Sequence, residues 1–223
     1  MYCDGQFDCP SWFQPSRPHK KDCNKCQLYF VNNEAKIEQW FPKPIYLLDN
    51  FCLNKLEAMD VWLFEMFMFN SDFKRTPELN VNSTHNQVNL EKEKFFEEFI
   101  YLLTNEAHKF ATILGYNLRT QELKLENMWS NLSLNGDYLF PHNHPSSFIS
   151  GAFYVDCDDD DVIKFYDNPQ NMISPSPAPN NYSFEDVAYR CIPSRLIMFK
   201  SDFMHGCPAL VGERKIVISF NFG

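Results

Sequence analysis

The stretch His142-Asn143-His144-Pro145 is the most informative part of the chain, together with His205 and the closing segment Arg214–Phe222 (RKIVISFNF). Two histidines separated by one residue on an extended segment point to the same side, because side chains alternate between the two faces of a strand. Three imidazoles from two elements can occupy one face of an octahedral metal ion and leave its other positions open. The pattern therefore predicts a metal centre formed by His142, His144 and His205.

The closing segment adds a cation beside this centre. If it is a strand, its residues divide into a largely polar face (Lys215, Val217, Ser219, Asn221) and an apolar one that also carries Arg214 (Arg214, Ile216, Ile218, Phe220, Phe222). An ammonium group and a hydroxyl on one inward face suit a buried carboxylate ligand. We therefore expect Lys215 to bind a carboxylate with help from Ser219, and Arg214 to replace Lys215 if the register shifts by one residue.

The chain before this region has a helical half and then a strand half. Apolar residues at helical spacing predict helices over 53–69 and 91–114, the first capped by Asn50 or Asn54 and the second ended by Gly115. A period of two then predicts strands over 123–133, 148–156, 162–166, 195–200 and 214–222. This order favours an α+β domain whose helices brace one face of a β-sandwich or barrel.

Several segments connect these elements. The strand that includes His142 is expected to continue through Tyr154, and 40–48 is expected to be a strand that its prolines keep at a sheet edge. The four consecutive acids at 158–161 indicate a tight, solvated hairpin turn. The Pro-rich stretch 168–193 is long enough for a flap over the site, and with the polar stretch 70–90 it is expected to face the substrate.

Composition limits the class of protein. The chain has 223 residues, 44% hydrophobic and 16% aromatic, which fits one domain over 31–223 preceded by a distinct segment over 1–30. We expect no membrane span and no secretion signal. The net charge of −9 does not favour nucleic-acid binding, although basic residues cluster between Arg17 and Lys25. Eight cysteines without a signal indicate reduced thiols, so the expected location is the cytoplasm of a bacterium, or of a host cell if the protein is viral.

The N-terminal segment contains half of these cysteines. Cys3, Cys9, Cys23 and Cys26 could bind a structural zinc ion, because the last two have the usual two-residue spacing, although the first two are further apart. The alternative is four free thiols. The other cysteines (52, 157, 191 and 207) are expected to be packing residues, and His19, His85 and His108 are expected to lie outside the metal site.

The sequence resembles a known family, the 2-oxoglutarate and iron(II)-dependent oxygenases, and in particular a subgroup from marine bacteria and their phages. The resemblance covers about residues 40–223 and is strongest after Trp129. The pieces that carry it are Trp129-Ser130-Asn131, Gly136, His142-Asn143-His144-Pro145, Ser150–Val155, Ile163–Pro169, Leu196–Phe199, His205, Arg214-Lys215 and Ser219-Phe220-Asn221.

The resemblance implies a double-stranded β-helix, or jelly-roll, and iron(II) held by the three histidines. It implies a 2-oxoglutarate carboxylate bound by the basic residue at Lys215, with Asn131 and Tyr154 as polar neighbours of this co-substrate. The implied reaction uses O2 and couples decarboxylation of 2-oxoglutarate to hydroxylation of an unknown substrate, either a protein side chain or a small molecule.

The sequence departs from the wider superfamily at one position. The usual pattern is His-x-Asp or His-x-Glu, and His144 stands in place of the carboxylate. Three neutral ligands leave the site more positive and also suit zinc, copper or nickel. Asp156 or Asp167 could supply a carboxylate instead. Two alternatives remain open: a cupin-like three-histidine metalloenzyme that does not use 2-oxoglutarate, and a non-catalytic jelly-roll binding protein.

Overall fold

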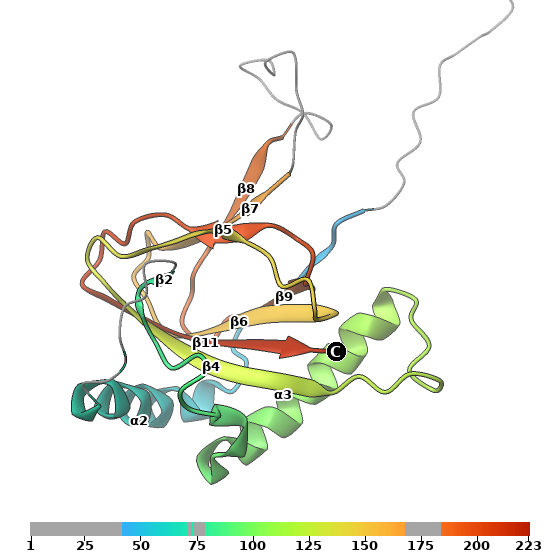
Figure 1. The fold of residues 1–223 in the computed structure, drawn as a ribbon, viewed down its shortest axis with the longest axis horizontal. Helices are drawn as coiled ribbons and strands as arrows, with labels where there is room; N and C mark the ends of the chain where they lie inside the picture. Colours follow the sequence, from blue (N-terminus) through green and yellow to red (C-terminus); the bar gives the residue numbers. More distant parts are fainter. Residues whose placement is uncertain (1–41, 71–72, 74–78, 168–183) are drawn as a thin grey trace, which may run out of the picture. The chain divides into compact units, whose positions relative to one another are not determined.

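Two antiparallel sheets form the centre of the structure (Figure 1). The computed structural model describes residues 42–70, 73, 79–167 and 184–223. One sheet has the strand order β1-β9-β6-β11-β4-β3 and the other the order β2-β5-β10-β7-β8. The strands are β1 Ile45–Leu48, β2 Leu79–Asn80, β3 Asn82–Ser83, β4 Leu125–Leu134, β5 Tyr138–His142, β6 Ile149–Asp156, β7 Val162–Tyr166, β8 Asp186–Arg190, β9 Leu196–Lys200, β10 His205–Cys207 and β11 Arg214–Phe222.

The chain crosses repeatedly between these sheets. From β4 to β11 it alternates from one sheet to the other, except at the β7–β8 hairpin, and every paired strand is antiparallel. This is the topology of a double-stranded β-helix, so the expected jelly-roll is confirmed. The strands expected over 123–133, 148–156, 162–166, 195–200 and 214–222 are present with ends that differ by at most a few residues.

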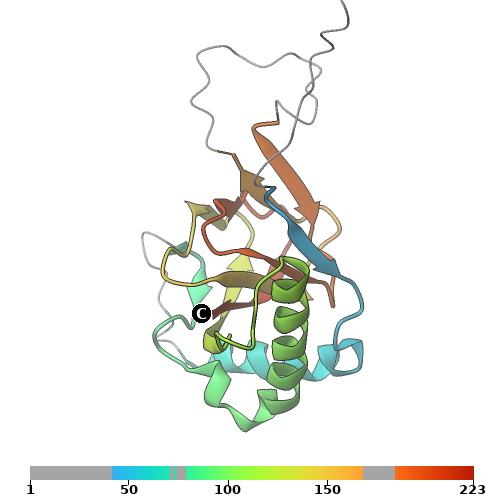
Figure 2. The same ribbon diagram turned by 90° about the vertical axis from the view of Figure 1, so that its right-hand side faces the viewer.

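Helices cover the outer face of the β4-β11-β6 sheet (Figures 1 and 2). They are α2 Leu56–Phe69 and α3 Glu97–Ile113, preceded by the 3₁₀ turns η1 Leu53–Lys55, η2 Leu90–Lys92 and η3 Lys94–Phe96. The expected asparagine caps are wrong, because Cys52 and Lys55 occupy the cap positions and neither makes a side-chain cap bond. Gly115 does end the second helix, with a φ of 84° that favours glycine.

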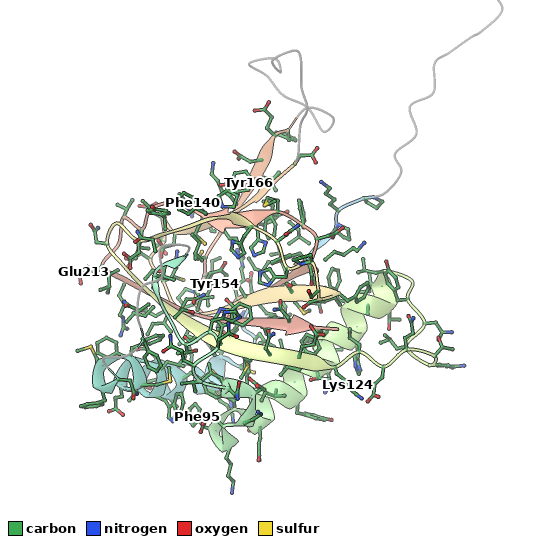
Figure 3. All side chains as sticks on the ribbon, viewed as in Figure 1. Phe95, Lys124, Phe140, Tyr154, Tyr166 and Glu213 are labelled. Carbon is green, nitrogen blue, oxygen red and sulfur yellow. The ribbon has the colours of Figure 1, made fainter. Side chains whose placement is uncertain are left out.

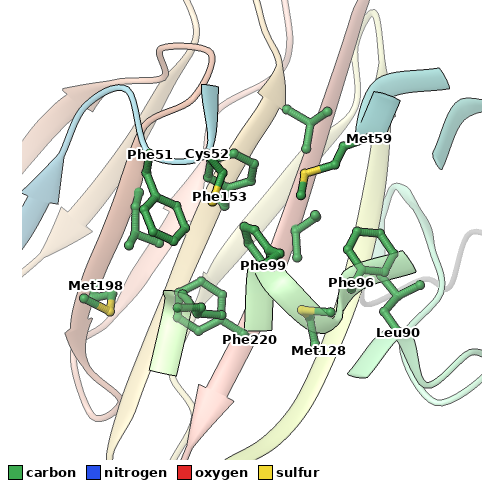
Figure 4. Close-up of a cluster of buried hydrophobic side chains, with 14 of the residues drawn as sticks. Phe51, Cys52, Met59, Leu90, Phe96, Phe99, Met128, Phe153, Met198 and Phe220 are labelled. Atoms are coloured by element: carbon green, nitrogen blue, oxygen red, sulfur yellow. The ribbon is translucent and has the colours of Figure 1, made fainter. Parts of the chain in front are cut away.

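Strand alternation separates the core from the interior of the jelly-roll. On β11, Ile216, Ile218 and Phe220 are fully buried against the helices, and Lys215 and Val217 face the other sheet. Figure 4 shows the helix-side cluster, in which Phe153 and Phe220 from the sheet lie beside Phe99 from α3. The helices therefore stabilise one face of the sheet and leave its opposite face free to line a site.

We expect Phe153→Ala to lower the free energy of unfolding by about 3–5 kcal/mol, because the substitution leaves a cavity between sheet and helices. Phe153 is fully buried, and its ring centroid lies 5.1 Å from that of Phe99 and 5.8 Å from that of Phe51. Urea denaturation measures the change. Phe69→Ala is the control, because Phe69 is 84% exposed and its loss should cost less than about 0.5 kcal/mol. Similar costs for both variants would contradict this packing.

Three connecting segments differ in part from what the sequence predicted. The strand expected over 40–48 begins at Ile45 and does lie at a sheet edge, paired with β9. The stretch 168–193 contains β8, which pairs with β7, so it is not wholly without structure; residues 168–183 lie outside the described residues. The turn at 158–161 joins β6 to β7, but these strands lie in opposite sheets, so it is not the expected hairpin, and Asp161 is only 6% exposed rather than solvated.

The secondary structure described above belongs to one compact unit, Lys43–Gly223. The cysteines considered for zinc (Cys3, Cys9, Cys23 and Cys26) lie outside the described residues. None of the helices in the described ranges has the length and apolarity needed to cross a bilayer.

Candidate metal centre

His142 and His205 face each other across two paired strands. His142 is the last residue of β5 and His205 the first of β10, and the two are directly opposite in the register. Their ring centroids are 4.5 Å apart. Backbone pairing therefore places two of the three expected ligands side by side.

His144 comes from the crossing that follows β5. Its backbone N–H donates to the Ser201 carbonyl over 2.8 Å, and its ring lies 5.2 Å from the rings of both His142 and His205. One ligand atom from each of the three histidines lies within 4.8 Å of the others. The structure thus brings together the three residues that the sequence pattern selected.

The strand argument that led to them was wrong in part. His142 does not begin a strand through Tyr154, because β5 ends at His142 in one sheet and β6 begins at Ile149 in the other. A turn between them, in which Ser147 N–H donates to the His144 carbonyl, carries the chain across. The two histidines converge through this turn rather than by alternation along one strand.

Hydrogen bonds fix which ring nitrogen of His142 and of His205 is free to bind a metal ion. Nδ1 of His142 lies 2.8 Å from the Phe140 carbonyl, and Nδ1 of His205 lies 2.9 Å from the Phe203 carbonyl. A carbonyl only accepts, so each Nδ1 carries the proton and each Nε2 is left with a free lone pair. Both rings are therefore held in the tautomer that a metal ligand at Nε2 requires.

Burial keeps two of these imidazoles neutral. Burial, with a smaller contribution from the neighbouring His142, lowers the pKa of His205 to about 3 and that of His144 to about 4. Metal ions compete with protons for imidazole, so a ring that is neutral well below pH 7 is available for coordination.

The three histidines lie at the edge of a cavity of about 280 Å³ between the sheets. Its walls come from β4, β5, β6, β7, β9, β10 and β11, and none of the described residues that line it is Asp or Glu. Figure 3 shows Tyr154 on β6 directed into the space between the two sheets. An interior without acids, beside a metal centre, favours an anionic ligand.

Lys215 lines the same cavity and is only 4% exposed. It has no ion-pair partner among the described residues. Burial alone would lower its pKa, but the combined field of Cys207, Cys191 and Asp161 raises it above the usual value. Lys215 is therefore a protonated, buried cation that faces open space.

Arg214 does not share this position. It lies on the opposite face of β11, where Nε donates to Asp156 over 2.7 Å and a terminal nitrogen donates to Asp60 over 3.1 Å. Asp156 is occupied by this pairing, and Asp167 pairs with Lys43. Among the described residues, neither aspartate belongs to the histidine cluster, so the alternative carboxylate ligands do not meet the metal site.

The other expected co-substrate residues, Asn131, Tyr154 and Ser219, all line the cavity. Asn131 is 6% exposed, and its Oδ1 is buried without a hydrogen-bond partner in the described part of the chain. A half-turn of the amide would present Nδ2 to an anion instead. Tyr154 is fully buried and hydrogen-bonds Cys191, and burial raises its pKa well above the usual value. It is therefore a neutral, packed wall of the cavity.

Sequence reasoning missed His85. This residue lines the cavity, and its ring centroid lies 4.8 Å from that of Trp129, which in turn stacks on His144. The neighbouring Thr84 exchanges hydrogen bonds with Ser130 on β4, and this contact brings the segment to the site. No local spacing relates His85 to the other histidines, so only long-range pairing could have identified it.

Gly206→Ala is expected to disturb this centre through the backbone. A Cβ at Gly206 would lie 2.8 Å from the Leu139 carbonyl oxygen and 3.1 Å from the Phe140 carbonyl carbon, so β5 would have to move. Overpacking of this kind costs about 1–3 kcal/mol of stability, and the shift separates His142 from His205. Thermal unfolding and metal titration measure the two effects. An unchanged melting temperature together with an unchanged metal affinity would show that the close approach of β10 to β5 does not affect the metal centre.

Comparisons with known proteins agree with this geometry. Residues 127–221 match the model of a family described as "Putative 2OG-Fe(II) oxygenase". The match includes all three histidines and Lys215. A search of curated proteins gave no match.

Several solved structures share the fold. HygX from Streptomyces hygroscopicus, with nickel and 2-oxoglutarate bound, is 10% identical, with a TM-score of 0.56 over 81% of this chain and 83% of that one. A prolyl-4-hydroxylase from Pseudomonas putida is 8% identical, with a TM-score of 0.56 over 81% and 92%. The viral collagen prolyl hydroxylase of Paramecium Bursaria Chlorella virus-1 is 10% identical, with a TM-score of 0.51 over 80% and 94%. At these identities the likeness supports the fold alone.

The residues present fit the metal and co-substrate of the oxygenase family. Imidazole nitrogen is a good ligand for iron(II), and the hydrogen bonds above orient two of the rings before any ion binds. A buried cation and an acid-free cavity suit a dicarboxylate. The three imidazoles and the positive charge in the cavity therefore both suit a metal ion with a bound dicarboxylate.

Proposed function

We propose that the protein is a 2-oxoglutarate- and Fe(II)-dependent dioxygenase that hydroxylates an organic substrate. The observation that carries the proposal is that one acid-free cavity has the three histidines at its edge and the unpaired cation of Lys215 on its wall. A dicarboxylate can then use one end for the metal and the other for the ammonium group. The reaction consumes 2-oxoglutarate, O2 and R–H, and yields succinate, CO2 and R–OH.

Each part of the site has a role in this reaction. Iron(II), when bound by His142, His144 and His205, supplies the redox chemistry that activates O2. Lys215 pairs with the distal carboxylate of 2-oxoglutarate, and Ser219 donates a hydrogen bond nearby. The buried walls, among them Tyr154 and Val217, exclude water from the reacting groups.

The substrate is proposed to approach from the side of His85 and Trp129. These residues border the cavity next to His144, on the wall formed by β4 and the segment before it. A small molecule and a protein side chain are both compatible with this approach. Neighbours of the fold include a hydroxylase of prolyl residues and a protein solved with hygromycin B, which illustrates both classes.

Succinate formation tests the proposal. The purified protein is given Fe(II), 2-oxoglutarate and O2, and succinate is measured with and without each component. Uncoupled turnover should give succinate even without a substrate, and omission of any component should abolish it. A protein that binds metal but gives no succinate under any condition would favour a non-catalytic jelly-roll binding protein.

A second outcome distinguishes the proposed dioxygenase from a cupin-like enzyme. A cupin-like three-histidine enzyme has no use for a cation at Lys215. Consumption of O2 with a substrate but without 2-oxoglutarate, at equal rates in the wild type and Lys215→Ala, would support that enzyme and reject the proposal.

A further inference from the structure

The ring of His144 lies against the indole of Trp129. The two ring centroids are 5.9 Å apart, and the ring planes differ by only 24°. The His144 ring is also nearly parallel to that of His205, with centroids 5.2 Å apart and an angle of 18°. Aromatic rings at these separations attract each other in offset-stacked arrangements. The imidazole of His144 therefore belongs to a stack that joins a residue of the sheet to another of the three histidines.

Trp129 occupies a rigid position. It lies in β4, where its register partner on β11 is Ser219, and it is only 8% exposed. The next residue, Ser130, accepts the Thr84 N–H on its carbonyl over 3.0 Å and donates its own N–H to the Thr84 hydroxyl over 2.9 Å. Strand pairing and burial therefore hold the indole in place before any ion binds.

The backbone of His144 is also fixed, but this does not fix its ring. The His144 N–H donates to the Ser201 carbonyl over 2.8 Å, and the His144 carbonyl accepts the Ser147 N–H over 3.1 Å. These bonds place the backbone and leave the side-chain torsions open. The last torsion of a histidine is broad, because it joins a tetrahedral carbon to a planar ring. The orientation of the ring must therefore come from the groups that touch it.

Ring orientation decides whether an imidazole can coordinate a metal ion. The lone pair of a ring nitrogen lies in the plane of the ring, so a ring that turns about its last torsion directs the lone pair away from the ion. For His142 and His205, the carbonyl two residues earlier holds Nδ1 and with it the ring. The His144 ring rests on the broad face of the Trp129 indole, which lets it slide but resists a turn out of the parallel plane.

We propose that Trp129 is a positioning residue of the metal centre: its indole holds the His144 ring in the plane in which a nitrogen lone pair can meet an ion shared with the other two histidines. The inference rests on the metal-binding part of the proposed function. One ligand atom from each histidine lies within 4.8 Å of the others in this stacked arrangement. Trp129 acts through His144 and supplies no ligand atom, because an indole N–H only donates.

Calorimetric titration with Ni(II) or Co(II), without 2-oxoglutarate, measures the effect on the metal site alone. Trp129→Leu removes the flat face but keeps an apolar side chain. Metal affinity is expected to fall about 10-fold or more, as is typical when a group that orients a ligand is lost. Trp129→Phe keeps a flat ring, so its affinity should stay within about threefold of the wild type. The visible spectrum of bound Co(II) reports the arrangement of its ligands, and it should change in Trp129→Leu and be retained in Trp129→Phe.

Trp62 supplies a matched control on the helix side of the sheet. It lies on α2, packs against the helix-side cluster and stacks on Phe95, with centroids 5.5 Å apart and ring planes 7° apart. Trp62→Leu removes a stacked indole by the same substitution, but away from the histidines. It should therefore lower the melting temperature while leaving metal affinity within about twofold of the wild type. Melting temperatures of both leucine variants show how much stability each substitution costs.

The role of Trp129 would be overturned by wild-type metal affinity in Trp129→Leu, by an equal loss in Trp129→Phe, or by an equal loss in Trp62→Leu. A loss in Trp129→Leu without a change in the Co(II) spectrum would also contradict it. If Trp129→Leu does not fold, Trp129→Met takes its place, because methionine fills irregular spaces and also lacks a flat ring. Failure of the wild type itself to bind Ni(II) or Co(II) would instead reject the metal site and with it the proposed function.

Discussion

His205→Ala is expected to lower the affinity for Fe(II) or Ni(II) by more than about 100-fold and to abolish succinate formation. Even a partner behind a ligand costs about 10–100-fold, and His205 is itself a ligand in the proposed site. The residue is only 7% exposed, its Nδ1 is fixed by the Phe203 carbonyl, and its ring lies 4.5 Å from that of His142. Two remaining imidazoles cannot hold one face of an octahedral ion.

His108→Ala provides the control for this result. His108 lies on α3, where Nε2 contacts the Leu123 carbonyl over 3.1 Å, and it does not belong to the histidine cluster. Metal affinity and turnover should therefore match the wild type. Calorimetry and succinate assays give both quantities. If His205→Ala retained metal affinity within a few-fold, or lost no more than His108→Ala, the ion would have to bind elsewhere.

Lys215→Met is expected to weaken 2-oxoglutarate binding by at least about 30-fold while leaving the metal affinity nearly unchanged. Loss of one member of a buried, hydrogen-bonded charge pair costs about 2–5 kcal/mol, and each 1.4 kcal/mol corresponds to about tenfold in affinity. Methionine keeps the length and apolar stem of lysine, so the loss reports the charge. Titration of the metal-loaded protein with 2-oxoglutarate under anaerobic conditions gives the dissociation constant.

The adjacent residue gives a discriminating comparison. Arg214 points to the other face of β11 and pairs with Asp156 and Asp60. Arg214→Ala should therefore lower stability, because it leaves two partly buried carboxylates without their partner, but change 2-oxoglutarate affinity by less than about threefold. The opposite result, with 2-oxoglutarate affinity lost in Arg214→Ala and kept in Lys215→Met, would mean that the strand binds the co-substrate in the other register.

The sequence predicted the long, strongly patterned elements well. The alternation of β11 separated Lys215 from Arg214, and the structure places only Lys215 in the cavity. The stripes of apolar residues also gave α2 and α3, since burial against one face of a sheet imposes that spacing. These elements bury whole faces, and their patterns are therefore visible in the local sequence.

The short strands could not be predicted in the same way. β5, β8 and β10 have only three to five residues each, which is too few to establish a period of two in the sequence. They form because distant strands offer them hydrogen bonds. The misassigned strand after His142 has the same cause, because nothing local shows that the chain leaves one sheet for the other between β5 and β6.

The site likewise contains residues that local sequence predicts and residues that it does not. The histidines were found because of their spacing, but the contacts of Trp129 with His85 and with His144 depend on pairing between segments far apart in the chain. Local sequence thus identified the ligands, and tertiary structure was needed to identify what orients them.

A crystal structure of the protein with Ni(II) and 2-oxoglutarate tests the central claim most directly. Ni(II) does not turn over, and its anomalous scattering locates the ion. The account predicts one strong peak bound by His142, His144 and His205, with a 2-oxoglutarate carboxylate against the Lys215 ammonium group. An ion bound away from these three histidines, or a 2-oxoglutarate molecule that does not reach Lys215, would contradict it.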